Sequence, residues 1–226
     1  MTMDFNGACN GRNEQQEMTM RQSSRFVSHP IAALLAALSF LGLTPGAAYA
    51  HEFVVEVRAV GDARAQILTE ALRGFLLATT ERDGHANEAS NGHLGGLDVY
   101  IAPRPTQVAA RFPDLRPVPP GGADFIAVIG AAQDVAAEAE TIGDDTVVLR
   151  PGRLHDANRW AGDEALDAQG FAARYLAAYG QPASEWAARG YNAARRIDDA
   201  VRPLGGVDDH AALARAFADS AAGIRW

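Results

Sequence analysis

GADFIAVIGAAQDVAAEAETIGDDTVVLRP, residues 122–151, carries the clearest signal of fold in this chain. Its apolar run at residues 125–129 is rich in β-branched side chains and ends at Gly130, which is typical of a strand buried on both faces. Good helix formers follow at residues 131–141, and a second β-branched run comes at residues 146–149. A strand, a helix and a strand in so short a segment predict one right-handed βαβ crossover with parallel strands.

Apolar periodicity extends this unit toward the N-terminus. Residues 53–60 alternate between apolar and charged side chains and predict a first strand. Residues 63–82 have one wide apolar face and predict a long helix, with Asp62 as its N-cap. Residues 97–102 predict the second strand, and the prolines that follow leave room only for a short helix at residues 106–112.

The C-terminal part shows only helical patterns. Residues 165–179, 184–201 and 209–220 predict three helices, and we expect the apolar stripe of the middle one to pack against the sheet. The stripe consists of Trp186, Ala187, Tyr191, Ala194, Ile197 and Val201. The sequence therefore predicts an α/β fold: one three-layer, Rossmann-like lobe with a parallel sheet of about four strands in the order 2-1-3-4 and a helical C-terminal part.

The N-terminus has the order of features found in secretory signal peptides. Arginines precede an apolar run at residues 31–43, and small side chains follow at residues 48–50. We expect residues 1–50 to be a signal peptide that is cleaved after Ala50, which leaves residues 51–226 as a single periplasmic domain. The alternative is a membrane-anchored N-terminus, but an apolar run of about 13 residues is short for a membrane span.

Composition narrows the range of partners. The chain has 226 residues, a formal net charge of -8 and one cysteine, Cys9, which lies in the predicted leader. The mature chain would thus form no disulfide, although the periplasm is oxidising. An acidic exported chain without a basic stripe is not expected to bind nucleic acid, or to insert into a membrane once the signal is cleaved.

Two blocks of the sequence resemble the type I periplasmic substrate-binding proteins, the branched-chain amino-acid-binding type that serves ABC importers. The C-terminal block has a segment similar to the family's F-x-x-x-Y-x-x-x-Y-G-x-x-P, with one residue instead of two between Gly180 and Pro182. It also has a helix similar to the family's G-Y-D-A motif and a D-x-x-A-L pattern, and GADFIAVIG resembles one of the family's strands. The matching positions of the C-terminal block are Phe171, Tyr175, Tyr179, Gly180, Pro182, Gly190, Tyr191, Asn192, Ala193, Asp209, Ala212, Leu213, Ala216 and Phe217. The resemblance implies an exported, non-catalytic solute-binding protein linked to an ABC importer or to a neighbouring periplasmic enzyme system.

The chain also departs from this family. Family members have two lobes that close on the ligand, whereas this chain passes almost directly from Leu149 to its closing helices, as if about one lobe were present. Ala131, Ala132 and Gln133 stand where the amino-acid binders carry Ser or Thr, so the sequence does not predict an ordinary amino-acid site. The alternative function is a periplasmic adaptor that has lost ligand binding and contacts a protein partner or a second copy of itself.

The carboxyl ends of the parallel strands form the open face where ligands bind in such sheets. We expect five polar side chains there, and the arginines among them suit a carboxylate. The alternative is that all five are polar loop tips. These predicted ligand-binding residues are Asp62, Arg104, Gln133, Arg150 and Arg153.

Other motifs give no catalytic or cofactor prediction. Asp83, His85, Glu88 and His93 lie in one polar loop, but their spacing matches no metal motif, so we expect a solvated turn rather than a docking surface or a metal site. Gly130 after a strand lacks the G-x-G-x-x-G context of a nucleotide site. The chain has no G-x-S-x-G and no H-E-x-x-H, so we predict no catalytic residues, metal or cofactor.

Overall fold

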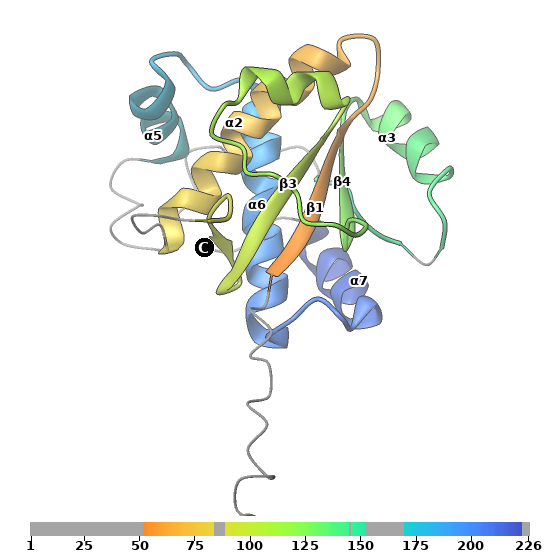
Figure 1. The fold of residues 1–226 in the computed structure, drawn as a ribbon. Coiled ribbons are helices and arrows are strands. Elements are labelled where there is room, and N and C mark those ends of the chain that lie inside the picture. Colours follow the sequence, from red (N-terminus) through yellow and green to blue (C-terminus); the bar gives the residue numbers. More distant parts are fainter. Residues whose placement is uncertain (1–51, 84–88, 145, 152–169, 223–226) are drawn as a thin grey trace, which may run out of the picture. The chain divides into compact units, whose positions relative to one another are not determined.

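The computed structural model describes residues 52–83, 89–144, 146–151 and 170–222, and these residues form an α/β fold (Figure 1). The predicted signal peptide lies outside the described residues. The strands are β1 (Glu52–Ala59), β2 (His93–Leu94), β3 (Leu97–Arg104), β4 (Phe125–Ile129) and β5 (Val147–Leu149). The helices are α2 (Arg64–Asp83), η1 (Thr106–Arg111), α3 (Ala132–Ala139), α5 (Gly170–Tyr179), α6 (Glu185–Leu204), α7 (His210–Asp219) and η2 (Ser220–Ala222).

The sheet has five strands in the order β2-β3-β1-β4-β5. β1 is central, since Val55 lies opposite both Ile101 of β3 and Phe125 of β4, and both pairings are parallel. β5 pairs in parallel with β4. The predicted order 2-1-3-4 is therefore confirmed for the four parallel strands, and their carboxyl ends lie along one edge of the sheet.

One short antiparallel strand was not predicted. β2 pairs with the start of β3, and Leu94 lies opposite Leu97. The two residues between them, Gly95 and Gly96, have positive φ angles of 66° and 84°, as a two-residue hairpin turn of this kind requires. A strand of two residues is too short to show alternation, so the Gly-Gly pair was the available signal within the expected loop.

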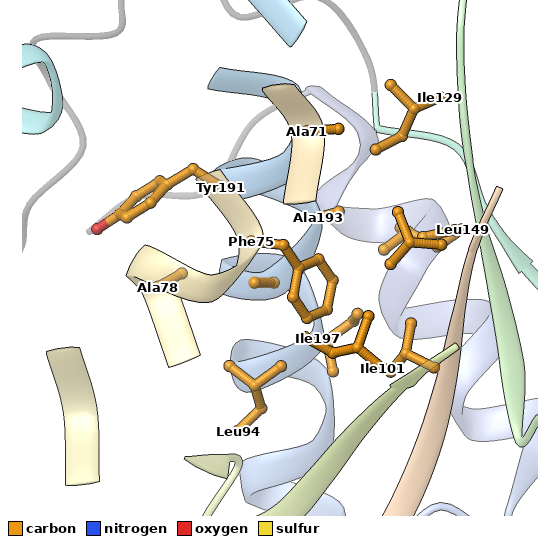
Figure 2. Close-up of a cluster of buried hydrophobic side chains, with 14 of the residues drawn as sticks. Ala71, Phe75, Ala78, Leu94, Ile101, Ile129, Leu149, Tyr191, Ala193 and Ile197 are labelled. Carbon is orange, nitrogen blue, oxygen red and sulfur yellow. The ribbon is translucent and has the colours of Figure 1, made fainter. Parts of the chain in front are cut away.

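The main hydrophobic core lies between the sheet and the helices α2 and α6. Alternate residues of β1, such as Val55 and Val57, are buried on this face. Figure 2 shows Phe75 of α2, Ile197 of α6 and Ile101 of β3 in the same cluster. The apolar face predicted for residues 63–82 is thus the face of α2 that packs on this core.

α2 and α6 approach each other closely because each has a glycine at the contact. A Cβ atom at Gly74 would lie 1.8 Å from the carbonyl oxygen of Ala187, and one at Gly190 would lie 1.9 Å from that of Ala71. Backbone atoms cannot move aside for a methyl group at such distances. α6 consequently packs along α2 as well as on the sheet, and the predicted stripe accounts for only part of its burial.

Side-chain and glycine caps set the ends of the last two long helices. The Ser184 hydroxyl accepts a hydrogen bond from Ala187 N–H at 3.1 Å at the start of α6. α6 continues past the predicted end, through Pro203, and stops at Gly205, which has a left-handed φ of 64°. Asp209 caps the start of α7.

The predicted cap of α2 is wrong. The helix begins at Arg64, and Asp62 is an exposed residue of the preceding turn. That turn is closed by a backbone hydrogen bond of 3.3 Å from Arg64 N–H to the carbonyl of Gly61. Asp62 therefore lies too far before the helix to serve as its cap.

α3 packs on the opposite side of β4 from α6 (Figure 1). Ile126 and Val128 of β4 and Val60 form a second, smaller cluster, against which Val135 of α3 packs. Residues of β4 thus alternate between two apolar contacts, which explains why its sequence is a continuous apolar run. α3 is shorter than the helix predicted at residues 131–141.

Candidate ligand-binding site

Two pockets open at the carboxyl edge of the sheet. The larger, about 650 Å³, lies beyond the ends of β4 and β5, and we call it the β4–β5 pocket. It is lined by Gly130, Ala131, Ala132, Val135, Ala136, Arg150, Pro151, Glu185, Trp186 and Arg189. The smaller, about 280 Å³, lies beyond the ends of β1 and β3, and we call it the β1–β3 pocket. It is lined by Arg58, Ala59, Val60, Gly61, Arg64, Arg104, Pro105 and Glu138.

The predicted ligand-binding residues do not form one cluster. Arg150 lines the β4–β5 pocket, whereas Arg104 lines the β1–β3 pocket. Gln133 and Asp62 are exposed and line neither of these pockets, and Arg153 lies outside the described residues. The sequence predicted one open face at this edge of the sheet. The structure instead has two pockets there, and each is lined by one of the predicted arginines.

α3 separates the two pockets. Glu138 on one side of this helix lines the β1–β3 pocket, and Val135 and Ala136 on another side line the β4–β5 pocket. Asp134, also on α3, lies close to the β1-to-α2 turn, because its Oδ2 would be 2.9 Å from a Cβ atom at Gly61. The sequence showed that α3 follows β4, but it did not show where each of its sides would lie.

Sequence reasoning missed the contribution of α6 to the β4–β5 pocket. The Arg189 guanidinium donates to Glu185 Oε1 at 2.7 Å and to the carbonyl oxygen of Gly130. Its carbon lies 4.8 Å from the ring centroid of Trp186, a cation–π contact. The spacing of Glu185, Trp186 and Arg189 could have indicated this cluster, since residues three and four positions apart are neighbours on a helix. Only the fold brings the start of α6 to the end of β4.

Arg189 is mostly buried beside this pocket, with an exposed side-chain fraction of 13%. Its Nε–H group is buried and has no hydrogen-bond acceptor among the described residues. Because this atom has almost no accessible surface, a group that enters the pocket would interact with the charge of the guanidinium rather than with the Nε–H group. The accessible wall of the pocket is otherwise mostly apolar.

A buried arginine holds the end of β5 in place. Arg196 of α6 donates to the carbonyl oxygen of Arg150 at 3.0 Å, to the Ser220 hydroxyl at 2.9 Å and to the carbonyl oxygen of Phe217. Burial lowers the pKa of Arg196 to about 10, which leaves the guanidinium charged at neutral pH. The backbone of Arg150 is therefore fixed at the rim of the β4–β5 pocket, while the side chain is exposed.

In the β1–β3 pocket, arginine is matched by carboxylates. Arg58 donates to Glu56 and to Glu138, each at 2.6 Å, and Arg104 Nε lies 3.5 Å from Glu56. Burial acts to lower the pKa of Arg58, but its hydrogen bonds to Glu138 and Glu56 outweigh this and raise the pKa. These contacts fasten α3 to β1.

The loop with four metal-type side chains does not show a metal site in its described part. His85 and Glu88 lie outside the described residues, and His93 Nε2 lies 2.9 Å from Asp98 Oδ1. The described part of the chain contains no group of three His, Cys, Asp or Glu side chains arranged to hold a metal ion. None of the described helices combines the length and apolarity needed to cross a membrane.

No protein-family model, curated protein or solved structure gives a significant match to this chain. The resemblance to type I periplasmic substrate-binding proteins therefore stays a prediction from the motifs quoted above. What can be said of function depends on the two pockets and their residues.

Proposed function

We propose that this chain is an exported, non-catalytic solute-binding protein, or a descendant of one, that supplies an ABC importer and binds its solute in the β4–β5 pocket. The observation that carries the proposal is the pocket itself. Its volume of about 650 Å³ lies in the range of small-molecule sites, and it combines mostly apolar walls with a few charged groups. It also lies beyond the carboxyl ends of parallel strands, where such sheets bind ligands.

The charged groups of the pocket support binding rather than proton transfer. Arg189 and Glu185 form an ion pair at 2.7 Å, and Arg189 also contacts the Trp186 ring. Arginine side chains remain charged at physiological pH and act by holding anions. We further propose that the domain is a three-layer lobe of the periplasmic-binding type, with α2 and α6 on one face of the sheet and α3 on the other.

Ligand binding can be tested by a thermal-shift screen of the purified protein against amino acids, aromatic and aliphatic acids, and alcohols. A ligand present at a hundredfold excess over its Kd should stabilise the native state by about 2.7 kcal/mol. We expect a saturable shift with one chemical class. A flat screen of a cooperatively folded sample would overturn the proposal and favour the adaptor that contacts a protein partner or itself.

The position of the site can be tested with two matched variants of α3. Ala136→Phe places a ring in the β4–β5 pocket, and Ala137→Phe places the same ring at a neighbouring exposed position that does not line it. We expect Ala136→Phe to abolish the thermal shift and Ala137→Phe to retain it. Equal shifts in both variants would show that the solute binds elsewhere.

Export can be tested separately, by expressing the full chain and measuring the mass of the protein in the periplasmic fraction. We expect a mature N-terminus at His51. A periplasmic product that retains residues 31–43 would show instead that the apolar run serves as an anchor.

A further inference from the structure

We infer that the solute of the β4–β5 pocket is an apolar monocarboxylate without an α-ammonium group. This inference rests on the proposed function and specifies the ligand class of the same site. It is carried by the balance of charge around the pocket, by the partners of each charged group and by the apolar walls.

The charge balance favours one negative charge. Among the described lining residues, Arg150 and Arg189 are positively charged and Glu185 is negatively charged, so these residues together carry one positive charge in excess. A monocarboxylate cancels this excess, and arginine pairs with carboxylates through strong, charge-assisted hydrogen bonds. The Arg189 guanidinium is already paired with Glu185, so Arg150, whose side chain is exposed, is the arginine that is better placed to pair with the carboxylate.

The start of α3 adds to the preference for an anion. Ala131, at the N-cap position, and Ala132 both line the pocket, and the helix has no side-chain hydrogen bond at its cap. The first backbone N–H groups of a helix have no partner within it and carry a partial positive charge. These N–H groups therefore add to the positive potential of the two arginines that line the pocket.

The same pocket does not suit an ammonium group. Glu185, the carboxylate among the described lining residues, already accepts a hydrogen bond from Arg189 at 2.7 Å. Because Arg189 already balances the charge of this carboxylate, an ammonium group would add a further positive charge to described lining residues that are already positive in sum, and this costs free energy. A zwitterionic amino acid should thus bind more weakly than the acid that lacks its amino group.

The apolar part of the solute would lie against small side chains. Ala132, Val135 and Ala136 of α3 and the half-buried Trp186 of α6 form the wall. Small wall residues leave room for a branched or aromatic group in a pocket of about 650 Å³. One face of the Trp186 ring is occupied by the Arg189 guanidinium, so we expect edge or rim contacts with the solute.

Isothermal titration with matched probes tests this inference on protein purified from cells that express the full chain. The first set is 3-phenylpropanoate, L-phenylalanine and 3-phenylpropan-1-ol, and the second is 4-methylpentanoate, L-leucine and 4-methylpentan-1-ol. We expect an acid to bind at least tenfold more tightly than both its amino acid and its alcohol. Amino acids or alcohols binding as tightly as the acids would overturn the inference but leave the proposed function intact, whereas no binding by any probe would reject the proposed function as well.

Two arginines at the carboxyl ends of different strands, Arg150 after β5 and Arg104 at the end of β3, supply the test and its control. Arg150→Gln should weaken binding of the acid at least tenfold and leave the affinity for the alcohol unchanged, because only the acid carries the charge. Arg104→Gln changes an arginine of the β1–β3 pocket that is also exposed, and it should leave the affinity for the acid within twofold. The reverse result, with Arg104→Gln weakening the acid and Arg150→Gln having no effect, would place the solute in the other pocket.

Discussion

In both pockets at the carboxyl edge of the sheet the described lining residues include more arginines than carboxylates, but the two pockets have different walls. Of the described residues, two arginines and Glu185 line the β4–β5 pocket, whereas three arginines and Glu138 line the β1–β3 pocket, and Glu56 pairs with two of these three arginines. The first has about 650 Å³ and mostly apolar walls, and the second has about 280 Å³ and mixed walls. Counting arginines therefore does not identify a solute site, because the apolar surface around them decides whether an organic group can bind.

The arginines of the two pockets also differ in what they stabilise. Arg58 joins β1 to α3 through Glu56 and Glu138 and so supports the fold. Arg150 has an exposed side chain, and its backbone is held by Arg196. This difference teaches that an arginine paired on both sides by carboxylates is the weaker candidate for ligand binding.

The difference between the two pockets depends most on the position of α6. This helix supplies Trp186 and Arg189 to the β4–β5 pocket, whereas the β1–β3 pocket has no lining residue from it among the described residues. In Gly190→Ala, the new methyl group would lie 1.9 Å from the carbonyl oxygen of Ala71. We expect the free energy of unfolding in urea to fall by more than about 3 kcal/mol, since the helices must separate. Gly206→Ala meets nothing within 4 Å and should change it by less than about 0.5 kcal/mol. Equal stabilities would show that the two helices can move apart without cost.

A smaller effect should follow from Glu81→Gln, which weakens the attachment of α5 and α6 to α2. Glu81 accepts hydrogen bonds from Arg174 at 2.7 Å and from the Tyr191 hydroxyl at 2.6 Å, and its side chain is only 8% exposed. Removing a charge from a buried ion pair should lower the free energy of unfolding by about 2–3 kcal/mol. Glu70→Gln, on the same helix but in an exposed hydrogen bond with Gln66, is the matched control and should have little effect. A similar loss in both variants would contradict a special role for the buried network.

Alkaline pH should act on the same network and not on the β1–β3 pocket. Burial, followed by the hydrogen bond to Glu81, raises the pKa of Tyr191 to about 12. Because the folded pKa lies above the value of about 10 for an unfolded chain, the stabilisation is complete below pH 10 and is lost as the pH rises through 12. The loss should be on the order of 1–3 kcal/mol in urea denaturation curves across this range. Tyr191→Phe should reduce that dependence and leave the part that comes from Tyr179, whose pKa burial also raises to about 12. An unchanged slope in the variant would count against the assignment to Tyr191.

The smallest effect should come from Glu138→Gln. This variant changes a residue of the β1–β3 pocket and tests whether the two pockets are independent. The pair of Glu138 and Arg58 is partly exposed, so its loss should lower the free energy of unfolding by less than about 1 kcal/mol. The affinity of the β4–β5 pocket for an acid should stay within twofold, because Glu138 lies on the other side of α3. Glu140→Gln, at an exposed position beyond α3, is the control. A large loss of affinity in Glu138→Gln alone would show that the two pockets are coupled.

The candidate site was partly predictable from the sequence. Arg104 and Arg150 follow strands, so their position at the carboxyl edge could be expected. Trp186 was expected in the core stripe of its helix, and Arg189 was not considered, because no local pattern tells which strand end the start of α6 meets. The role of Arg196 was also not predicted. Its partners are backbone carbonyl oxygens and a hydroxyl group, so no acidic residue at a suitable spacing marks it in the sequence.

The sequence by itself determined the parallel strands, their order and most helix positions, because apolar periodicity and glycine or polar caps act over a few residues and short crossovers allow few topologies. Tertiary structure alone decided that Gly74 and Gly190 face each other, that α3 divides the strand-end edge into two pockets and that α6 completes one of them. These features depend on contacts between residues far apart in the chain. Their geometry is set by close packing of whole elements, which no local pattern encodes.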